Sequence, residues 1–316
     1  MGGPTEYAFR RQLGTAPVPH VAEKICTMGR RTTDHSRNVR PSPLVCLVTG
    51  ASRGIGLETT LELERRGHRV YAGMRDPDRR NAEAAARISA RAVVLQLDVT
   101  DDAAVVRALD EVVQVETRID VVVNNAGFGA ATSVEEATVE QARRIFDTNV
   151  LGPLRLICAA VPRMRSQGSG VVVQVSSLNG RLVPPLGGLY AASKFALEAL
   201  SEALAYEVAR FGVRVAIIEP GPYETGVWDA LDIGPSLADG RSPYAPLFER
   251  TFPTFRSRAL PNVREVAVAI ADAVEDPATP LRVPVGMTIE RFRERRRELD
   301  DEQFAPGWWE RARNTW

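Results

Sequence analysis

The chain has 316 residues, of which 44% are hydrophobic and 25% charged, a composition typical of a soluble globular protein with a sizeable core. Its formal net charge is zero, so the charge balance gives no reason to expect binding to nucleic acid. The three cysteines are odd in number and far apart, which favours a reducing, cytoplasmic setting over a disulfide framework, and without a long apolar run we expect no membrane span.

The two ends of the chain differ in composition from its middle. Residues 1–42 contain several prolines and arginines but no sustained hydrophobic period, so we predict a disordered leader there. Residues 43–287 alternate short apolar runs with amphipathic patterns and are predicted to form one domain. Residues 288–316 are rich in charge and predict a charged helical extension.

The middle of the chain predicts about seven strands separated by helices. The expected strands are 44–50, 69–74, 92–99, 119–127, 170–177, 213–221 and 281–286. The expected helices are 55–67, 78–90, 101–116, 138–167, 190–209 and 263–275. Continuous Val/Ile/Leu runs are typical of strands that are buried on both faces of a parallel sheet. With strand–helix alternation and right-handed crossovers, they predict a doubly wound α/β fold with helices on both faces.

A glycine-rich turn, "TGASRGIG" at residues 49–56, joins the first predicted strand to the first helix. In such a sheet ligands bind beyond the carboxyl ends of the strands, and a helix N-terminus attracts phosphate. Glycines at this point allow a tight turn and let the backbone approach the phosphates. The turn therefore predicts a dinucleotide site formed by Gly50, Ser52, Arg53, Gly54, Ile55 and Gly56.

The second predicted strand is not followed directly by the carboxylate that commonly holds the ribose of NAD. It runs instead into Arg75. Together with Arg53, this side chain could bind a 2′-phosphate through charge-assisted hydrogen bonds. We therefore expect NADP(H) in preference to NAD(H). The alternative is that both arginines only reflect the heavy use of arginine in this chain.

Tyr190 and Lys194 are separated by four positions in a predicted helix, which places them on one face. Lys194 is one of only two lysines in the chain, and the three histidines lie elsewhere. We therefore expect an acid/base group other than histidine, and no metal site. A nearby ammonium favours the ionised phenol, so we also expect Lys194 to lower the pKa of Tyr190.

These motifs resemble the classical short-chain dehydrogenase/reductase family, with hydroxysteroid and retinol dehydrogenases as the most similar members. "TGASRGIG", "LDVT" (97–100), "NNAG" (124–127), "VSS" (175–177), "YAASK" (190–194) and "PGPYET" (220–225) occur in the family's order. The resemblance covers about residues 43–286. It implies a Rossmann-type fold, a nicotinamide cofactor, and interconversion of an alcohol and a carbonyl compound.

The resemblance also implies roles for individual residues. Tyr190 corresponds to the general acid/base, Lys194 to the lysine that holds the nicotinamide ribose, and Ser177 to the serine that hydrogen-bonds the substrate oxygen. Asn149 corresponds to the asparagine that holds a water in the proton relay. Cofactor contacts are implied for Asp98, Val99, Asn125, Ala126, Gly127, Tyr190, Lys194, Pro220, Gly221 and Thr225, in addition to the glycine turn and Arg75.

Residues 222–262 occupy the place of the family's substrate lid and are rich in proline and aromatic residues. Since pockets are mostly apolar, this lid favours a hydrophobic secondary alcohol and its ketone, or an aldehyde/alcohol pair. Two alternatives stay open: a 3-ketoacyl reductase, and a catalytically silent regulator that senses the cofactor. The family resemblance further implies a homodimer, formed through the helix of Asn149 and the helix at 190–209.

Overall fold

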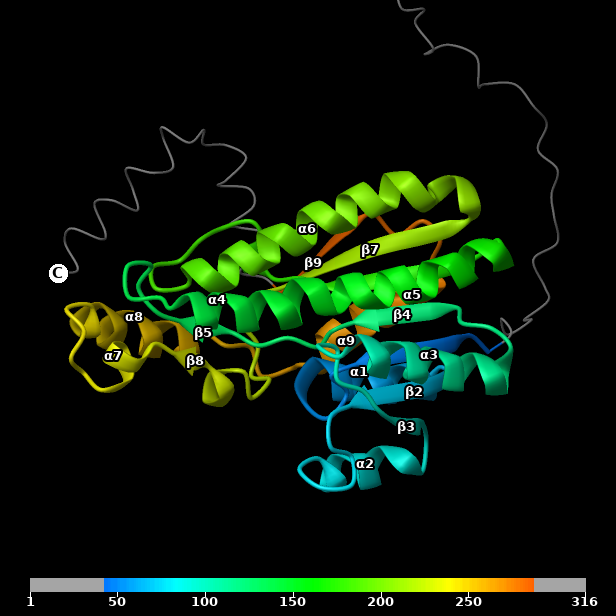
Figure 1. The fold of residues 1–316 in the computed structure, drawn as a ribbon, viewed down its shortest axis with the longest axis horizontal. Coiled ribbons are helices and arrows are strands. Elements are labelled where there is room, and N and C mark those ends of the chain that lie inside the picture. Colours follow the sequence, from blue (N-terminus) through cyan, green and yellow to red (C-terminus); the bar gives the residue numbers. More distant parts are fainter. Residues whose placement is uncertain (1–42, 287–316) are drawn as a thin grey trace, which may run out of the picture. The chain divides into compact units, whose positions relative to one another are not determined.

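The computed structural model describes residues 43–286, which form a single α/β domain (Figure 1). The leader predicted at 1–42 and the charged extension predicted at 288–316 lie outside the described residues. Both remain predictions.

The centre of the domain is a parallel sheet of seven strands in the order β3-β2-β1-β4-β6-β7-β9. Its strands are β1 (Val45–Thr49), β2 (Arg69–Met74), β3 (Val93–Gln96), β4 (Val121–Asn124), β6 (Gly170–Val175), β7 (Val213–Pro220) and β9 (Arg282–Val285). The order reverses between β1 and β4, which is where a doubly wound sheet binds its ligand. The predicted Rossmann-type fold is therefore confirmed.

Helices cover both faces of this sheet. One layer contains α1 (Gly54–Arg65), α2 (Ala82–Ser89) and α9 (Arg264–Glu275), and the other contains α3 (Asp102–Glu116), α5 (Gly152–Gln167) and α6 (Gly188–Val208). Successive strand residues point to opposite faces. In β1, Cys46 and Val48 therefore join the first core, whereas Val45 and Leu47 join the second. Both faces of the strand are buried, as its continuous apolar sequence predicted.

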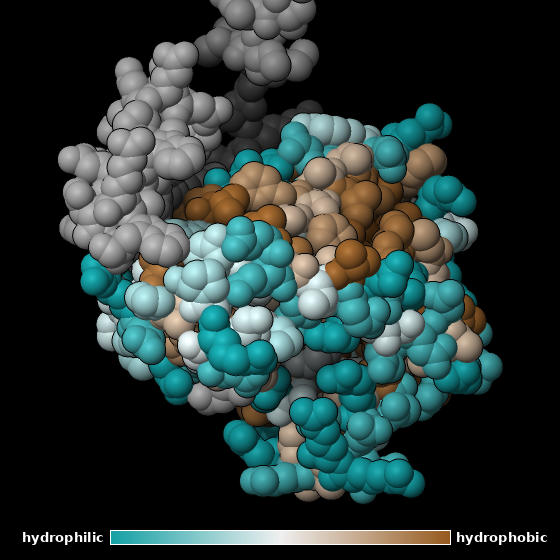
Figure 2. All heavy atoms as spheres, turned by 60° about the vertical axis from the view of Figure 1, so that its left-hand side comes forward, coloured by the Kyte–Doolittle hydropathy of each residue, from teal (hydrophilic) through white to brown (hydrophobic). Residues whose placement is uncertain are grey.

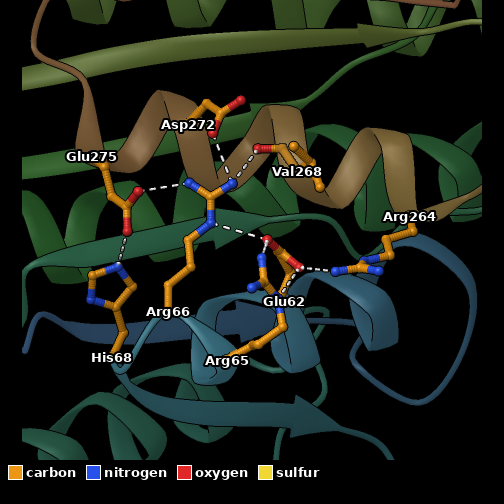
Figure 3. A network of polar contacts seen from close by, with 8 residues as sticks. All are labelled: Glu62, Arg65, Arg66, His68, Arg264, Val268, Asp272 and Glu275. Carbon is orange, nitrogen blue, oxygen red and sulfur yellow. Dashed lines mark hydrogen bonds and ion pairs between the residues drawn. The ribbon is translucent and has the colours of Figure 1, made fainter.

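A polar network ties α9, near the end of the domain, to α1 (Figure 3). Glu62 accepts hydrogen bonds from Arg65 and Arg66 and forms an ion pair with Arg264. Arg66 also pairs with Asp272 and Glu275 on α9. The side chain of Glu62 is only 2% exposed, so these cations compensate a buried charge that would otherwise be unfavourable.

The helix predicted at 138–167 is interrupted. It consists of α4 (Val139–Phe146), a π-helical segment η1 (Asp147–Leu151) and α5, and the amide of Gly152 bonds to the carbonyl of Asp147. Pro153 has no N–H and cannot continue the regular pattern of hydrogen bonds, which explains the wide turn just before it. The π segment buries Asn149 completely.

The run Val139–Gln167 is long and apolar enough to cross a membrane by length and composition. Core helices of soluble proteins pass the same test, and here Leu156, Ala160 and Met164 of α5 pack in the second core. The expectation of no membrane span thus stays a prediction.

The lid region, for which the sequence indicated no particular elements, contains short ones. They are η4 (Trp228–Ala230), β8 (Asp232–Ile233), α7 (Pro235–Ala238) and α8 (Ala245–Ser257). β8 pairs with β5 (Ala130–Ala131) in a small second sheet. Phe248 stacks on Phe252 with 4.9 Å between ring centres and gives α8 an apolar face. The sequence analysis did not predict this helix. Single turns of 3₁₀-helix, η2 (Leu178–Gly180) and η3 (Ala209–Phe211), complete the domain.

Candidate active site

A cavity of about 760 Å³ runs across the carboxyl ends of the sheet strands. Its walls come from the segments that follow six of the seven strands, and from the lid. The predicted site residues that line it are Gly50, Ser52, Arg53, Gly54, Ile55, Arg75, Asp98, Val99, Asn125, Ala126, Gly127, Ser177, Tyr190, Lys194, Pro220, Gly221 and Thr225. Gly56 and Asn149 are not among the lining residues.

The glycine turn leaves no room for side chains at Gly54 and Gly56, among other positions. Gly54 has φ +54°, and a Cβ there would lie 2.8 Å from the carbonyl oxygen of Thr225. A Cβ on Gly56 would lie 2.3 Å from the carbonyl oxygen of Gly50. Gly56 therefore acts on the site indirectly, because its lack of a side chain lets the start of α1 pack under the turn.

Asn125 fixes this turn from the neighbouring strand. Its side-chain amide donates to the carbonyl of Thr49 at 2.9 Å and to that of Gly50 at 3.3 Å. The Thr49 hydroxyl in turn accepts the backbone amides of Asn125 and Ala126. The exposed N–H groups at the start of α1 are thus held beside the cavity, as a diphosphate requires.

One end of the cavity is basic. Arg53, Arg75 and Arg80 line it, and within residues 43–286 none of these guanidinium groups forms an ion pair. The side chain of Asn81 donates to the Arg75 carbonyl and closes the loop after β2. Sequence reasoning missed Arg80 and Asn81, although the run of arginines after β2 was a usable signal. The glycine turn and this basic end together fit a dinucleotide with phosphate groups.

Ser177, Tyr190 and Lys194 meet in the middle of the cavity. Ser177 follows β6, and its hydroxyl is close enough to the phenol of Tyr190, in the first turn of α6, to lower the pKa of that phenol. Lys194, one turn further, is 5% exposed and donates to the carbonyl of Val175 at 2.9 Å. Its nitrogen lies 5.8 Å from the centre of the Tyr190 ring. Three of the predicted site residues therefore lie together in the cavity.

The pKa values of this group differ from the expectation. Burial raises the pKa of Tyr190, and the hydrogen bond with Ser177 opposes that effect. Burial also lowers the pKa of Lys194 to about 8, while the nearby charge of Glu198 raises it. The expected lowering of the Tyr190 pKa by Lys194 is thus not found for the protein's own groups, because desolvation dominates over the contact with the ring face.

Asn149 lies behind the cavity wall. Its side chain donates to the Phe128 carbonyl at 3.0 Å and to the Ser193 hydroxyl at 3.1 Å, and accepts the Phe128 amide at 3.1 Å. These contacts link η1 to α6 and to the segment after β4. The side chain therefore positions the active-site wall, and a part in the proton relay stays a prediction.

The lid end of the cavity is mostly apolar, although Arg258 also lines it. Trp228, Phe248, Phe252 and Phe255 line it together with Leu182 and Pro185 from the loop before α6. Trp228 meets Phe252 edge-on, with ring centres 5.8 Å apart. Among the lid aromatics, Tyr244 lies outside the cavity lining, and Tyr223 packs deep enough to bond Glu265 on α9.

The family model for short chain dehydrogenases matches residues 44–234. The chain belongs to the short-chain dehydrogenase family. It is 34% identical to 3-ketodihydrosphingosine reductase of Bacteroides thetaiotaomicron over 78% of this chain and 90% of that protein. It is also 34% identical to human retinol dehydrogenase 8, over 76% of this chain and 81% of the relative. The protein is therefore an oxidoreductase enzyme.

Solved structures agree with the fold. A short-chain dehydrogenase from Streptomyces avermitilis is 33% identical, covers 86% of this short-chain dehydrogenase and 98% of its own chain, and superimposes with a TM-score of 0.72. One from Burkholderia cenocepacia, solved with NADP, is 28% identical with a TM-score of 0.63 over 80% and 92% of the two chains. Another, from Burkholderia phymatum, was solved with NAD and is 23% identical (TM-score 0.68, 81% and 93% covered). Structural neighbours of this enzyme thus bind nicotinamide cofactors of both kinds.

Proposed function

We propose that the enzyme is an NADP(H)-dependent oxidoreductase that interconverts a hydrophobic secondary alcohol and its ketone, or an aldehyde/alcohol pair. The observation that carries this proposal is the position of Ser177, Tyr190 and Lys194 in one cavity, between a basic end and an apolar end. A basic end suits a phosphorylated dinucleotide, and an apolar end suits an apolar substrate.

In the reduction direction, the nicotinamide supplies the hydride when it is bound. The carbonyl oxygen of the substrate accepts hydrogen bonds from Ser177 and Tyr190, which stabilise the charge that grows on that oxygen. Tyr190 then donates its proton to this oxygen. The ammonium of Lys194 offsets the negative charge left on the phenol. For alcohol oxidation the same groups work in reverse, with ionised Tyr190 as the base.

The preference for NADP(H) is supported by Arg53, Arg75 and Arg80, which line one end of the cavity without ion pairs in the described part of the chain. We expect Arg75→Gln to raise the KM for NADPH about tenfold and to leave the KM for NADH nearly unchanged. Arg79→Gln is a matched control, because Arg79 belongs to the same loop but does not line the cavity. Equal use of NADPH and NADH by the wild-type enzyme would refute this part of the proposal.

The substrate class is supported by the aromatic wall of the lid and by the names of two relatives, which specify retinol and 3-ketodihydrosphingosine. The test is a panel of aromatic, steroid, retinoid and acyl carbonyl compounds, each assayed with NADPH and with NADH. We expect the highest kcat/KM for a long or polycyclic apolar carbonyl. A best substrate that is small and charged would contradict the proposal, and preference for an acyl thioester would favour the 3-ketoacyl reductase.

A homodimer is the second part of the proposal. Leu151, Phe195 and Tyr206 are large hydrophobic residues on η1 and α6 that are 43%, 43% and 71% exposed. Figure 2 shows hydrophobic surface across the upper part of the domain, at the height where Figure 1 has α5 and α6. Such a patch is typical of an interface, and most soluble oligomers are symmetric. A monomeric mass in light scattering at micromolar concentration would contradict the dimer.

A further inference from the structure

A buried ionic cluster lies directly behind the catalytic residues. It consists of two carboxylates, Glu198 on α6 and Glu219 on β7, and two guanidinium groups, Arg181 after η2 and Arg282 on β9. The side chains of Glu198 and Glu219 are 6% and 1% exposed. Burying charged groups costs desolvation free energy, so a cluster that joins four segments suggests a functional role.

The contacts in the cluster have short distances. Arg282 donates to Glu198 at 2.9 Å and to Glu202 at 2.6 Å. Arg181 donates to Glu219 at 3.0 Å and lies 4.0 Å from Glu198. Two cations therefore approach the Oε2 atom of Glu198, Arg282 more closely than Arg181.

Three members of the cluster lie close in sequence to residues of the cavity. Glu198 follows Lys194 by one helical turn, and Glu219 directly precedes Pro220. Arg181 directly precedes Leu182, which lines the apolar end. Ser176, just before Ser177, faces Glu198 and stabilises its charged form. The cluster thus forms a layer beneath the catalytic residues.

We propose that Glu198 is a positioning residue that acts through Lys194, with a negative charge that keeps the buried ammonium protonated. This inference rests on the proposed role of Lys194 in catalysis. Lys194 has no carboxylate partner at hydrogen-bond distance in the described residues, and its ammonium is bound by the neutral carbonyl of Val175. The charge of Glu198, one turn away, raises the pKa of Lys194 and opposes the effect of burial. Burial raises the pKa of Glu198 itself, and Arg282 and Arg181 oppose that effect and favour its ionised form.

Glu198 and the charged groups around it each shift the pKa of Lys194 in a direction that follows from their charge. Glu198, Glu202 and Glu219 are negative and favour the ammonium, whereas Arg181 and Arg282 are positive and oppose it. Removal of the Glu198 charge should therefore lower the pKa of Lys194. Removal of the Arg181 charge should raise it, because Glu198 keeps its charge through the closer contact with Arg282. A purely structural role would not produce opposite shifts.

The chain allows a direct measurement, because Lys24 and Lys194 are its only lysines. In a Lys24→Arg background, lysine labelled with ¹³C at Cε gives one NMR signal, and its pH titration reports Lys194 alone. We expect a midpoint at about 8 in this background, a lower midpoint for Glu198→Gln and a higher one for Arg181→Gln. Glu207→Gln, an exposed charge change on the same helix, should leave the midpoint unchanged.

The pH dependence of carbonyl reduction should shift in the same order as the titration midpoints of Lys194. Its rate falls as the pH rises through the pKa of Lys194, so the alkaline limb moves to lower pH in Glu198→Gln, and each unit of displacement lowers the rate about tenfold above that limb. Unchanged titrations, or shifts of the same sign for Glu198→Gln and Arg181→Gln, would overturn the inference. If Glu198→Gln does not fold, the shift in Arg181→Gln alone decides. If the midpoints shift as expected but the wild-type protein shows no reductase activity, the proposed function would be refuted and this inference would not.

Discussion

Lys194 places its ammonium 5.8 Å from the centre of the Tyr190 ring, one turn along α6, and donates to the carbonyl of Val175. The cation therefore faces the ring of Tyr190. In this arrangement Tyr190 is a protonated acid over most of the pH range, since burial raises its pKa. The lysine is the group that first loses its proton as the pH rises, because burial lowers its pKa to about 8.

Replacement of Tyr190 by phenylalanine tests the acid/base role. Phe keeps the ring that lies against Lys194 but removes the proton donor, so we expect kcat to fall about 10²–10⁴-fold with little change in NADPH affinity. Steady-state rates and fluorescence titration with NADPH measure the two quantities. Tyr206→Phe is the control, because Tyr206 is 71% exposed on the same helix and should keep its activity. A Tyr190→Phe enzyme with a near-normal rate would remove the basis of the proposed mechanism.

Replacement of Lys194 by methionine should abolish turnover but stabilise the fold at neutral pH. The pKa of Lys194 falls from 10.5 to about 8 on folding, so its charged form destabilises the folded state below pH 8. This destabilisation decreases as the pH rises from 8 to 10.5. Methionine avoids the penalty but leaves the Val175 carbonyl without its donor, so we expect a net gain of about 1 kcal/mol at pH 7.

Urea unfolding at pH 7 and at pH 10 measures this gain. The advantage of Lys194→Met should shrink at the higher pH, where the wild-type lysine is neutral in the folded state. A variant that is less stable than the wild type at pH 7 would show that the buried ammonium is compensated by its surroundings.

Local patterns were sufficient to predict the seven strands and the shared helix face of Tyr190 and Lys194, whereas Ser177 was joined to them by the family resemblance. Strand order and the position of these residues follow from general rules for parallel sheets, which depend on few long-range details. The π segment around Asn149 was not predicted, because a helix with a wide turn and a regular helix have almost the same apolar period. The helices of the lid were missed because prolines and aromatics dominate that sequence.

The role of Glu198 was beyond reach for a different reason. In sequence it is an acidic residue in an amphipathic helix, where a solvated position is the ordinary expectation. Its partner Arg282 comes 84 positions later, on the last strand of the sheet. Only the fold brings them together, so burial of this carboxylate is a tertiary property. The same holds for Glu62, whose partner Arg264 lies far along the chain on α9.

Glu62 gives the last prediction. Its hydrogen bond with Arg65 lowers its pKa to about 2, against burial and with the help of Arg66 and Arg264. A carboxylate with a depressed folded pKa adds stability that is complete above its unfolded pKa of 4.5 and is lost as the pH falls toward 2. We expect Glu62→Gln to lower the free energy of unfolding by about 2–3 kcal/mol at pH 7, since three arginines lose a shared partner.

The loss should diminish as the pH falls from 4.5 toward 2, because the wild-type carboxylate then becomes protonated as well. Glu64→Gln is the matched control: Glu64 is on the same helix, and its contact with Arg91 is longer, at 3.8 Å, and more exposed. Surface pairs of this kind contribute less than about 1 kcal/mol. Equal destabilisation by Glu62→Gln and Glu64→Gln would mean that the link between α1 and α9 depends on apolar packing alone, without the buried charge of Glu62.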